Sequence, residues 1–403
     1  PSGYGENTLA NPSVSTAASN GAVVLVSVDF GEPDYAESLQ ELRQLVTSAG
    51  MHVRATVEGK RSTPDAKLFI GSGKADELKL MLESSDTDLV AFNHDLSPSQ
   101  QRNLERFLQA KVLDRTGLIL DIFAQRAKSH EGKLQVELAQ LEHLSTRLVR
   151  GWTHLERQKG GIGVRGGPGE TQLEMDRRML RDRVKQLREK LAKLKQQRGM
   201  QRRARKRSNT MTVSLVGYTN AGKSTLFNRL TQSGVYAADQ LFATLDTTSR
   251  KMYLGEDDYS DDGAYYGSNM AVISDTVGFI KHLPTTLIEA FGATLEEAAQ
   301  ADLLLHVVDV ASSNRDAQVM QVNSVLQEIG ASNVPQLLVL NQIDRLEHAN
   351  LEDGAGFERD EYGRIYQVRV SAKTGAGIEF IKLALTEHQQ LLKKLSTEES
   401  AYA

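Results

Sequence analysis

The sequence predicts an α/β protein made of three parts that follow one another along the chain. Residues 22–117 alternate short apolar strands with helical stretches, which is typical of a small α/β domain. Residues 118–207 carry two leucine-rich stripes at helical spacing, so we expect an antiparallel helical hairpin. Residues 208–396 return to strand–helix alternation, which predicts a doubly wound sheet. We expect residues 1–21 to be a disordered segment and residues 397–403 to be a tail.

In the N-terminal domain, we expect strands at 22–29, 52–58, 67–70, 88–93 and 111–114. Helices are expected near 35–49, 73–84 and 98–109. The last of these begins with a capping box, in which Ser97 is the N-cap, Pro98 takes the first helical position and Gln100 reaches back. The segment Gly71-Ser-Gly-Lys74 lacks the full spacing of a phosphate-binding loop, so we interpret it as a helix-entry turn.

The helical hairpin is predicted from two apolar stripes that could not form a core singly. The first comprises Leu134, Leu138, Leu141, Leu148 and Trp152, and the second Leu173, Leu180, Val184, Leu187, Leu191 and Leu194. Between them, six of the eleven residues 159–169 are glycine, so this run is expected to be the loop at the hairpin tip. Glu170 then opens the second helix, which leads into a basic linker at residues 202–207.

In the C-terminal domain we expect strands at 211–216, 271–275, 303–309, 336–340 and 366–370. A phosphate-binding pattern lies after the first of them. Residues 217–224, Gly-Tyr-Thr-Asn-Ala-Gly-Lys-Ser, match G-x-x-x-x-G-K-S/T between a strand and a helix. Glycines let backbone N–H groups approach phosphate oxygens, and the helix N-terminus adds partial positive charge. We expect Lys223 to reach the β- and γ-phosphates and the Ser224 hydroxyl to bind Mg²⁺.

Two further motifs supply groups for Mg²⁺ and the γ-phosphate. Asp275-Thr-Val-Gly278 ends an apolar strand, where the carboxylate suits a water-mediated contact with Mg²⁺ and the Gly278 N–H suits the γ-phosphate. Upstream, Phe242-Ala-Thr-Leu-Asp246 offers Thr244 as a second hydroxyl ligand of Mg²⁺ in the triphosphate state. This short motif carries weight only because it lies between the phosphate-binding loop and Asp275.

The choice of base is predicted from Asn341-Gln-Ile-Asp344, which follows another apolar strand. The Asp344 carboxylate can accept hydrogen bonds from both N1–H and the 2-amino group of guanine, whereas adenine offers neither donor. Ser371-Ala-Lys373 fits the loop whose backbone contacts the guanine oxygen. Together these motifs predict a P-loop GTPase domain. The expected nucleotide-binding residues are Gly217, Tyr218, Thr219, Asn220, Ala221, Gly222, Lys223, Ser224, Thr225, Phe242, Ala243, Thr244, Leu245, Asp246, Asp275, Thr276, Val277, Gly278, Asn341, Gln342, Asp344, Ser371, Ala372 and Lys373.

Three positions bear on catalysis and affinity. Gln342 stands where most such proteins carry lysine, so we expect weaker packing on the purine. Phe279 follows Gly278 where Ras-like GTPases place a water-positioning glutamine, and phenylalanine cannot orient water. Asn220 takes the position that helps hold a monovalent cation in potassium-dependent relatives. We therefore assign catalysis to Lys223, Thr244 and Gly278, with Asn220 as a ligand of K⁺.

Composition excludes several other classes of protein. The absence of cysteine excludes disulfides, thiolate metal sites and cysteine nucleophiles, and favours the cytoplasm. The longest apolar runs are too short to span a bilayer, and residues 1–21 lack the features of a signal peptide, so we expect no membrane partner. The nine histidines show no metal-ligand spacing.

Charge is distributed unevenly around a net value of −4. From Arg147 to Arg207 there are 20 Lys and Arg against 6 Asp and Glu, a net of +14, which leaves −18 for the remainder. One basic segment on an acidic protein favours a localised surface for a polyanion. Charge alone would favour the simpler interpretation, a solvated helical face.

The chain resembles the HflX family of ribosome-associated GTPases. The resemblance is carried by residues 160–174 (Gly-Gly-Ile-Gly-Val-Arg-Gly-Gly-Pro-Gly-Glu-Thr-Gln-Leu-Glu), by 217–224, 242–246 and 275–279, and by Asp114-Arg-Thr-Gly-Leu-Ile-Leu-Asp-Ile-Phe123. It covers roughly residues 22–396. It implies a monomeric factor that binds GTP and GDP, docks on the large ribosomal subunit and splits stalled ribosomes under stress.

The same resemblance implies that the glycine-rich loop probes the peptidyl-transferase region while the basic hairpin lies on rRNA. The rRNA-binding residues would then be Lys159, Gly160, Gly161, Arg165, Gly166, Gly167, Arg177, Arg181 and Lys185. Two alternatives remain open. One is a GTP-gated docking module for subunit maturation or dormancy, without splitting activity; the other, a general RNA-binding ATPase, is disfavoured by Asp344.

Overall fold

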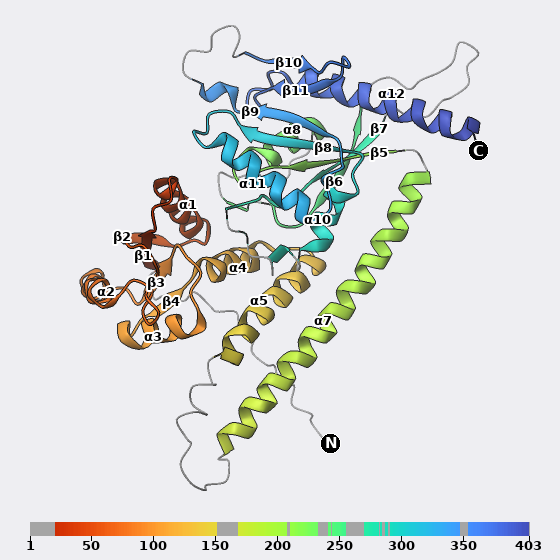
Figure 1. The fold of residues 1–403 in the computed structure, drawn as a ribbon. Helices are drawn as coiled ribbons and strands as arrows, with labels where there is room; N and C mark the ends of the chain where they lie inside the picture. The colour runs from red at the N-terminus through yellow and green to blue at the C-terminus, as the bar shows by residue number, and fades with distance from the viewer. Residues whose placement is uncertain are drawn as a thin grey trace, which may run out of the picture. The chain divides into compact units, whose positions relative to one another are not determined.

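The structure is a computed structural model that describes residues 21–150, 168–207, 210–232, 241–242, 244–254, 270–281, 283, 287–288, 291–346 and 354–402. Figure 1 shows the elements in chain order. The chain forms two compact units. Unit 1 comprises Pro1–Gln125 and Val136–Lys185, and unit 2 comprises Arg126–Gln135 and Gln186–Ala403. The segment expected as a separate hairpin domain is thus shared between the two units.

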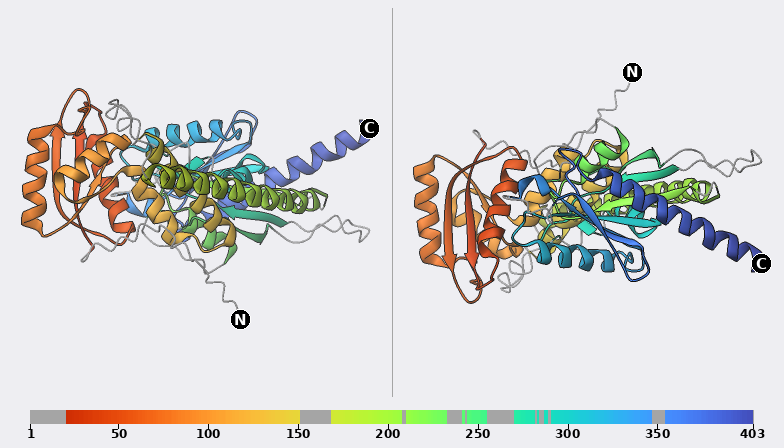
Figure 2. Two further views of the ribbon diagram at one scale, coloured as in Figure 1. Left: turned by 90° about the horizontal axis from the view of Figure 1, so that it is seen from below. Right: turned by 90° about the horizontal axis from the view of Figure 1, so that it is seen from above.

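Unit 1 is built on a four-stranded parallel sheet in the order β2-β1-β3-β4. The strands are β1 (Ala22–Asp29), β2 (His52–Lys60), β3 (Leu89–Phe92) and β4 (Lys111–Leu113). Helix α1 (Tyr35–Ser48) covers one face of this sheet, and α2 (Ser72–Ser85) and α3 (Pro98–Leu108) cover the other (Figures 1 and 2). The expected small α/β domain is confirmed.

The expected strand at 67–70 is wrong. The Asp65 carboxylate accepts hydrogen bonds from the backbone N–H groups of Lys67 (2.9 Å) and Leu68 (2.7 Å), which folds the segment into a turn. Phe69 takes a left-handed conformation with φ of 63°, and only an isolated bridge joins it to Asp65. By contrast, the capping box at Ser97 is confirmed, because both of its reciprocal hydrogen bonds are present.

Three helices follow the first sheet: α4 (Arg115–Arg126), α5 (His130–Arg150) and α7 (Pro168–Arg207). Within unit 1, Arg183 of α7 donates to Glu137 of α5 at 2.7 Å. Within unit 2, Arg198 of α7 pairs with Glu131 of α5 at 2.8 Å. Since positions later in α7 meet positions earlier in α5, the two helices run antiparallel, as expected. Of the predicted tip loop at 159–169, residues 159–167 lie outside the described residues, whereas 168 and 169 belong to α7. The second helix thus begins at Pro168, two residues before the expected Glu170, and it continues through the expected linker at 202–207.

Unit 2 contains a seven-stranded sheet in the order β10-β11-β9-β8-β5-β7-β6. The central strands are parallel, while β6 and β10 at the two edges pair antiparallel. The strands are β5 (Met211–Val216), β6 (Thr248–Tyr253), β7 (Met270–Asp275), β8 (Leu303–Asp309), β9 (Gln336–Asn341), β10 (Gly356–Arg359) and β11 (Ile365–Arg369). The helices are α8 (Lys223–Thr231), α10 (Gly292–Ala299), α11 (Arg315–Glu328), the short η1 (Ile343–Arg345) and α12 (Ile378–Tyr402).

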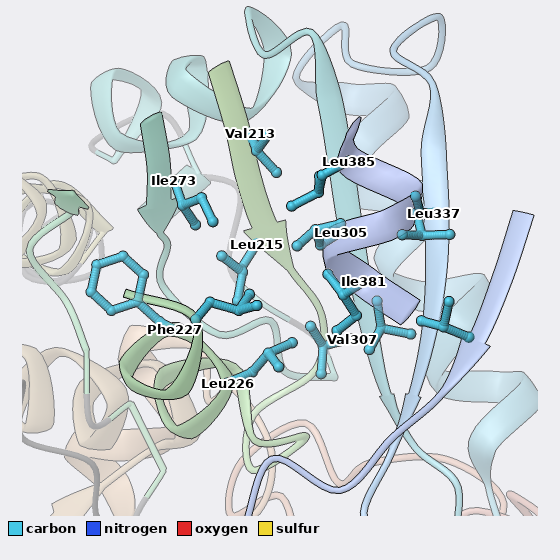
Figure 3. Close-up of a cluster of buried hydrophobic side chains, with 14 of the residues drawn as sticks. Val213, Leu215, Leu226, Phe227, Ile273, Leu305, Val307, Leu337, Ile381 and Leu385 are labelled. Atoms are coloured by element: carbon cyan, nitrogen blue, oxygen red, sulfur yellow. The ribbon is translucent and has the colours of Figure 1, made fainter. Parts of the chain in front are cut away.

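The core of unit 2 fixes the strands that end at the nucleotide motifs. Apolar side chains from the central strands meet α8 and α12 in one cluster (Figure 3). Its labelled members include Val213, Leu215, Leu226, Phe227, Ile273, Leu305, Val307, Leu337, Ile381 and Leu385. Helix α12 continues to Tyr402, so the segment expected as a tail after residue 396 is helical through that residue.

Candidate nucleotide-binding site

The nucleotide motifs gather at one edge of the second sheet. Strands β5, β7, β9 and β11 end there. Asp275 is the last residue of β7, and the segments after the other three strands carry the phosphate-binding loop, Asp344 and Ser371. Parallel strands present their carboxyl ends to the same edge, which is the usual ligand side of an open α/β sheet. The sequence order of the motifs therefore becomes a spatial cluster.

Close backbone packing explains two glycines of the phosphate-binding loop. A Cβ atom on Gly217 would lie 2.2 Å from the carbonyl oxygen of Val307. A Cβ atom on Gly222, whose φ is +91°, would lie 2.3 Å from Nδ2 of Asn341. Side chains at either position would push the loop away from β8 or from the base-binding segment. The glycines thus let the loop curl tightly before α8 begins.

Lys223 is buried at the start of α8 and spans the loop it follows. Its Nζ donates to the carbonyl oxygens of Gly217 (3.0 Å) and Tyr218 (2.8 Å). Burial lowers the pKa of Lys223 to about 8, and the nearby Asp275 carboxylate acts in the opposite direction. A bound phosphate would favour the charged ammonium, so this side chain is placed to bind an anion.

Three oxygen-bearing side chains that the sequence predicts as a Mg²⁺ site lie close together. Ser224 Oγ donates to Asp275 Oδ2 at 2.7 Å and lies 2.8 Å from Thr244 Oγ1. Asp275 is fully buried, and its Oδ1 has no hydrogen-bond donor among the described residues. Burial raises the pKa of Asp275, which a divalent cation would counteract. Two hydroxyls and one carboxylate suit Mg²⁺, which keeps several waters and phosphate oxygens as ligands.

The Gly278 segment lies against the phosphate-binding loop. The backbone N–H of Thr219 donates to the carbonyl of Phe279 (2.8 Å), and the N–H of Phe279 donates to that of Gly217 (3.1 Å). A Cβ atom on Gly278 would lie 3.0 Å from Lys223 Nζ. Gly278 is therefore beside the lysine expected to hold the γ-phosphate. Thr276 and Val277 are buried, and the Thr276 hydroxyl donates to Leu215 O at 2.7 Å.

The Phe279 ring is fully buried. It therefore faces the protein interior, and catalysis must use other groups to orient water. Truncating such a ring to alanine costs about 3–5 kcal/mol of stability, which would obscure any kinetic effect. Phe279→Leu keeps an apolar side chain at this position, and we expect it to leave the basal rate of phosphate release nearly unchanged.

The base-binding motifs are joined to each other and to the phosphate-binding loop. Asn341 donates from Nδ2 to Ala221 O (2.8 Å) and accepts at Oδ1 from Ala372 N–H (2.9 Å). Gln342 donates from Nε2 to Asn220 O at 2.8 Å. Gln342 thus links the base segment to the phosphate-binding loop.

Asp344 is exposed at its expected place after β9. Its Oδ1 accepts a hydrogen bond from Ser371 Oγ at 2.6 Å. Arg229 donates to the carbonyls of Ala372 (3.1 Å) and Lys373 (2.5 Å), and these hydrogen bonds hold the segment that begins at Ser371 in place. The structure thus places Asp344, the residue predicted to read guanine, beside the Ser371 segment.

The Thr244 segment divides into buried and polar positions. Phe242 and Leu245 are buried and hold Thr244 beside Ser224, whereas Ala243 lies outside the described residues. Asp246, also expected to bind nucleotide, instead contacts Lys128 and Ser129 through 2.8 Å hydrogen bonds from their backbone N–H groups. Sequence reasoning missed Ser129. Its place before a helix is typical of an N-cap, but that pattern does not indicate the contact with Asp246.

The expected rRNA-binding residues are only partly described. Arg181 and Lys185 are exposed on α7 and Arg177 is half-buried, while Lys159 and the loop residues to Gly167 lie outside the described part. No helix within the described ranges has the length and apolar character needed to cross a bilayer.

Three family models match successive parts of the chain. "GTP-binding GTPase N-terminal" matches residues 36–124, "GTP-binding GTPase Middle Region" matches 126–205, and "50S ribosome-binding GTPase" matches 212–342. The last of these spans the phosphate-binding loop, Asp275 and the start of the base segment. The three matches follow the same order as the parts expected from the sequence.

Known relatives share most of the chain. GTPase HflX of Escherichia coli (strain K12) is 54% identical over 364 residues, which cover 90% of this chain and 82% of that protein. GTPase HflX of Magnetococcus marinus is 49% identical over 341 residues, covering 85% and 75%. Among solved structures, the "crystal structure of SsGBP and GDP complex" aligns with a TM-score of 0.51 at 23% identity, covering 92% of this chain and 99% of that one. At that identity, the last match supports the fold alone.

Proposed function

The chain belongs to the HflX family of GTPases, and from this premise we propose that it binds the large ribosomal subunit and separates stalled or idle ribosomes under stress. GTP hydrolysis is the activity of the family, and we assign it to the nucleotide site described above. The observation that supports a ribosomal partner most directly is the basic segment, with a net charge of +14 between Arg147 and Arg207. A ribosomal partner would make the cytoplasm the compartment of action.

The nucleotide site supports phosphoryl transfer to water by positioning and charge. Lys223 and the backbone N–H groups of the phosphate-binding loop would hold the phosphates, and Gly278 would donate to the γ-phosphate. Ser224, Thr244 and Asp275 would hold Mg²⁺, the last through water. The metal would supply positive charge against the phosphate oxygens. Because Phe279 is buried, we propose a slow basal rate that ribosomes stimulate.

The ribosome would be contacted by two parts of the hairpin. Arg177, Arg181 and Lys185 on α7 are proposed to neutralise rRNA phosphates. The glycine-rich loop at 160–169 is proposed to reach the peptidyl-transferase region, since its glycines would let backbone approach crowded RNA. The alternative is a GTP-gated docking module in subunit maturation or dormancy, which would use the same nucleotide residues without splitting ribosomes.

Sedimentation of ribosomes separates the two proposals. With GTP or a non-hydrolysable analogue, the native protein should convert intact ribosomes into free subunits. Deleting residues 161–167 and closing the chain with a short turn should leave GTP affinity and most subunit binding intact while abolishing the separation. If the native protein binds ribosomes but never separates them, the docking module is the better account. If the deletion variant splits ribosomes normally, the loop is not the probe.

We also propose that K⁺ assists hydrolysis beside Asn220. Asn220 has φ of 61°, and its carbonyl accepts from Gln342. Replacing sodium by potassium should raise the basal rate of the native protein. Asn220→Gly should lose this difference and keep its GDP affinity, because glycine adopts the same positive φ without strain. The measurement is phosphate release at equal ionic strength. Equal rates in both salts for the native protein would exclude the cation.

A further inference from the structure

Asp246 lies two residues after Thr244, yet its carboxylate is engaged by the start of α5. Its Oδ2 accepts from the backbone N–H groups of Lys128 and Ser129, each at 2.8 Å. Its Oδ1 accepts from the Ser129 hydroxyl at 2.5 Å. A carboxylate at a helix N-terminus interacts favourably with the unpaired N–H groups there. Asp246 therefore binds the first turn of α5 from outside the helix.

The fit around this carboxylate requires a glycine. Ser129 Oγ also accepts from the N–H of Gly132 at 2.8 Å, so Ser129 caps α5 while it binds Asp246. A Cβ atom on Gly132 would lie 2.0 Å from Asp246 Oδ1. Glycine within a helix costs about 1 kcal/mol relative to alanine. The close approach of Asp246 accounts for glycine at this position.

The other end of the same short segment lies in the nucleotide site. Thr244 Oγ1 is 2.8 Å from Ser224 Oγ, and Leu245 between Thr244 and Asp246 is buried. Consecutive Cα atoms are about 3.8 Å apart, so two residues leave little slack between Thr244 and Asp246. A displacement of Asp246 must therefore shift Thr244 or distort the backbone between them.

The first turn of α5 is itself held by charged contacts. Glu131 pairs with Arg198 of α7 at 2.8 Å, and Arg198 also lies 3.7 Å from Glu297 of α10. Lys195 of α7 pairs with Glu296 at 3.3 Å. Ion pairs thus join the end of α5 that binds Asp246 to α7, and join α7 to α10. Because this end of α5 is held in place, it can fix the position of the Thr244 segment.

We propose that Asp246 is a positioning residue for GTP hydrolysis, which ties Thr244 to the first turn of α5. Its role is to fix the Thr244 hydroxyl beside Ser224 and Asp275, without itself contacting the nucleotide. Because coupling between two sites is reciprocal in binding free energy, GTP binding at Thr244 also stabilises the first turn of α5. Thr244 is needed for the triphosphate state, so GDP binding is little affected.

Two chemically different substitutions test this link. Asp246→Ala removes the carboxylate. Gly132→Ala pushes the carboxylate away from α5 without changing either of the two residues that form the contact, Asp246 and Ser129. Both should lower kcat by about tenfold to a hundredfold, the cost of a misplaced catalytic group. Both should leave GDP affinity within about twofold. Asp246→Asn should restore most of kcat, because its amide oxygen can still accept from the two backbone N–H groups and its amide nitrogen can donate to Ser129 Oγ. Gly199→Ala, at a position of α7 with no atom within 4 Å of the added Cβ, is the matched control and should be silent.

Amide hydrogen exchange gives a readout that does not depend on turnover. In the native protein, GTP should slow exchange at residues 128–132 relative to GDP, and this difference should vanish in Asp246→Ala and Gly132→Ala. If both variants keep native kcat, Asp246 only stabilises α5 and the proposal is overturned. If Asp246→Asn is as impaired as Asp246→Ala while Gly132→Ala is normal, the carboxylate acts on the nucleotide directly, which also overturns it.

Discussion

Asp344→Asn should lower the affinity for GTP by about a hundredfold or more and admit xanthosine triphosphate in its place. The carboxylate can accept from both N1–H and the 2-amino group of guanine. Asparagine presents a donor at one of these places, so one hydrogen bond is lost and two donors oppose each other. Each unsatisfied group costs about 1–3 kcal/mol, more where charge is involved. At about 1.4 kcal/mol per tenfold change, the sum gives the stated loss.

Xanthine reverses the mismatch, because it carries a carbonyl oxygen where guanine carries the amino group. In the native protein, the Ser371 hydroxyl donates to Asp344 Oδ1 at 2.6 Å. In the variant, the same hydroxyl can rotate and accept a hydrogen bond from the asparagine amide. The matched control is Asp309→Asn, which removes a carboxylate that accepts from Arg345 next to Asp344. It should change GTP affinity by less than a few-fold. Equilibrium binding of fluorescent GTP, GDP and xanthine nucleotides measures these values. Equal competition by ATP in the native protein would refute the assignment of Asp344.

Much of the nucleotide site could be predicted from the sequence because most of its motifs, all but the Thr244 segment, lie at the end of an apolar strand. Val213, Ile273 and Val339 belong to buried strands that pair in parallel with a neighbouring strand. Once these strands are parallel neighbours, the segments after them must meet at one edge. The contacts of Ser224 with Asp275 and of Asn341 with Ala221 follow from that geometry.

Other features depend on contacts between segments far apart in the sequence. Strands β6 and β10 lie at sheet edges and expose much of their surface, so they lack the apolar pattern by which the central strands were found. The turn at 67–70 depends on the Asp65 side chain, which competes with strand hydrogen bonds. The contact between Asp246 and Ser129 joins positions 117 residues apart, and no periodicity or motif spacing could indicate it.

Reversing Arg177, Arg181 and Lys185 to glutamate should weaken binding to the large ribosomal subunit by at least a hundredfold at moderate salt. Each phosphate neutralised by a cationic side chain releases counterions, so the native protein should lose roughly a thousandfold in affinity between low and moderate salt if it makes several such contacts. Removing three contacts should lower the slope of log affinity against log salt by about three. Co-sedimentation with purified subunits across a salt series measures both quantities.

The matched control reverses three exposed cations of unit 2, Arg250, Lys251 and Lys382, which changes the net charge by the same amount. General electrostatic attraction to RNA would weaken equally in both triple variants, whereas a specific rRNA surface on α7 predicts a loss confined to the first. GTP affinity must remain native in each, since Arg177 is half-buried and its replacement could disturb the hairpin. If the hairpin only holds the two α/β domains apart, neither triple variant will change co-sedimentation or its salt slope. That outcome would remove the main physical support for a ribosomal partner, because the basic segment would then be a solvated helical face.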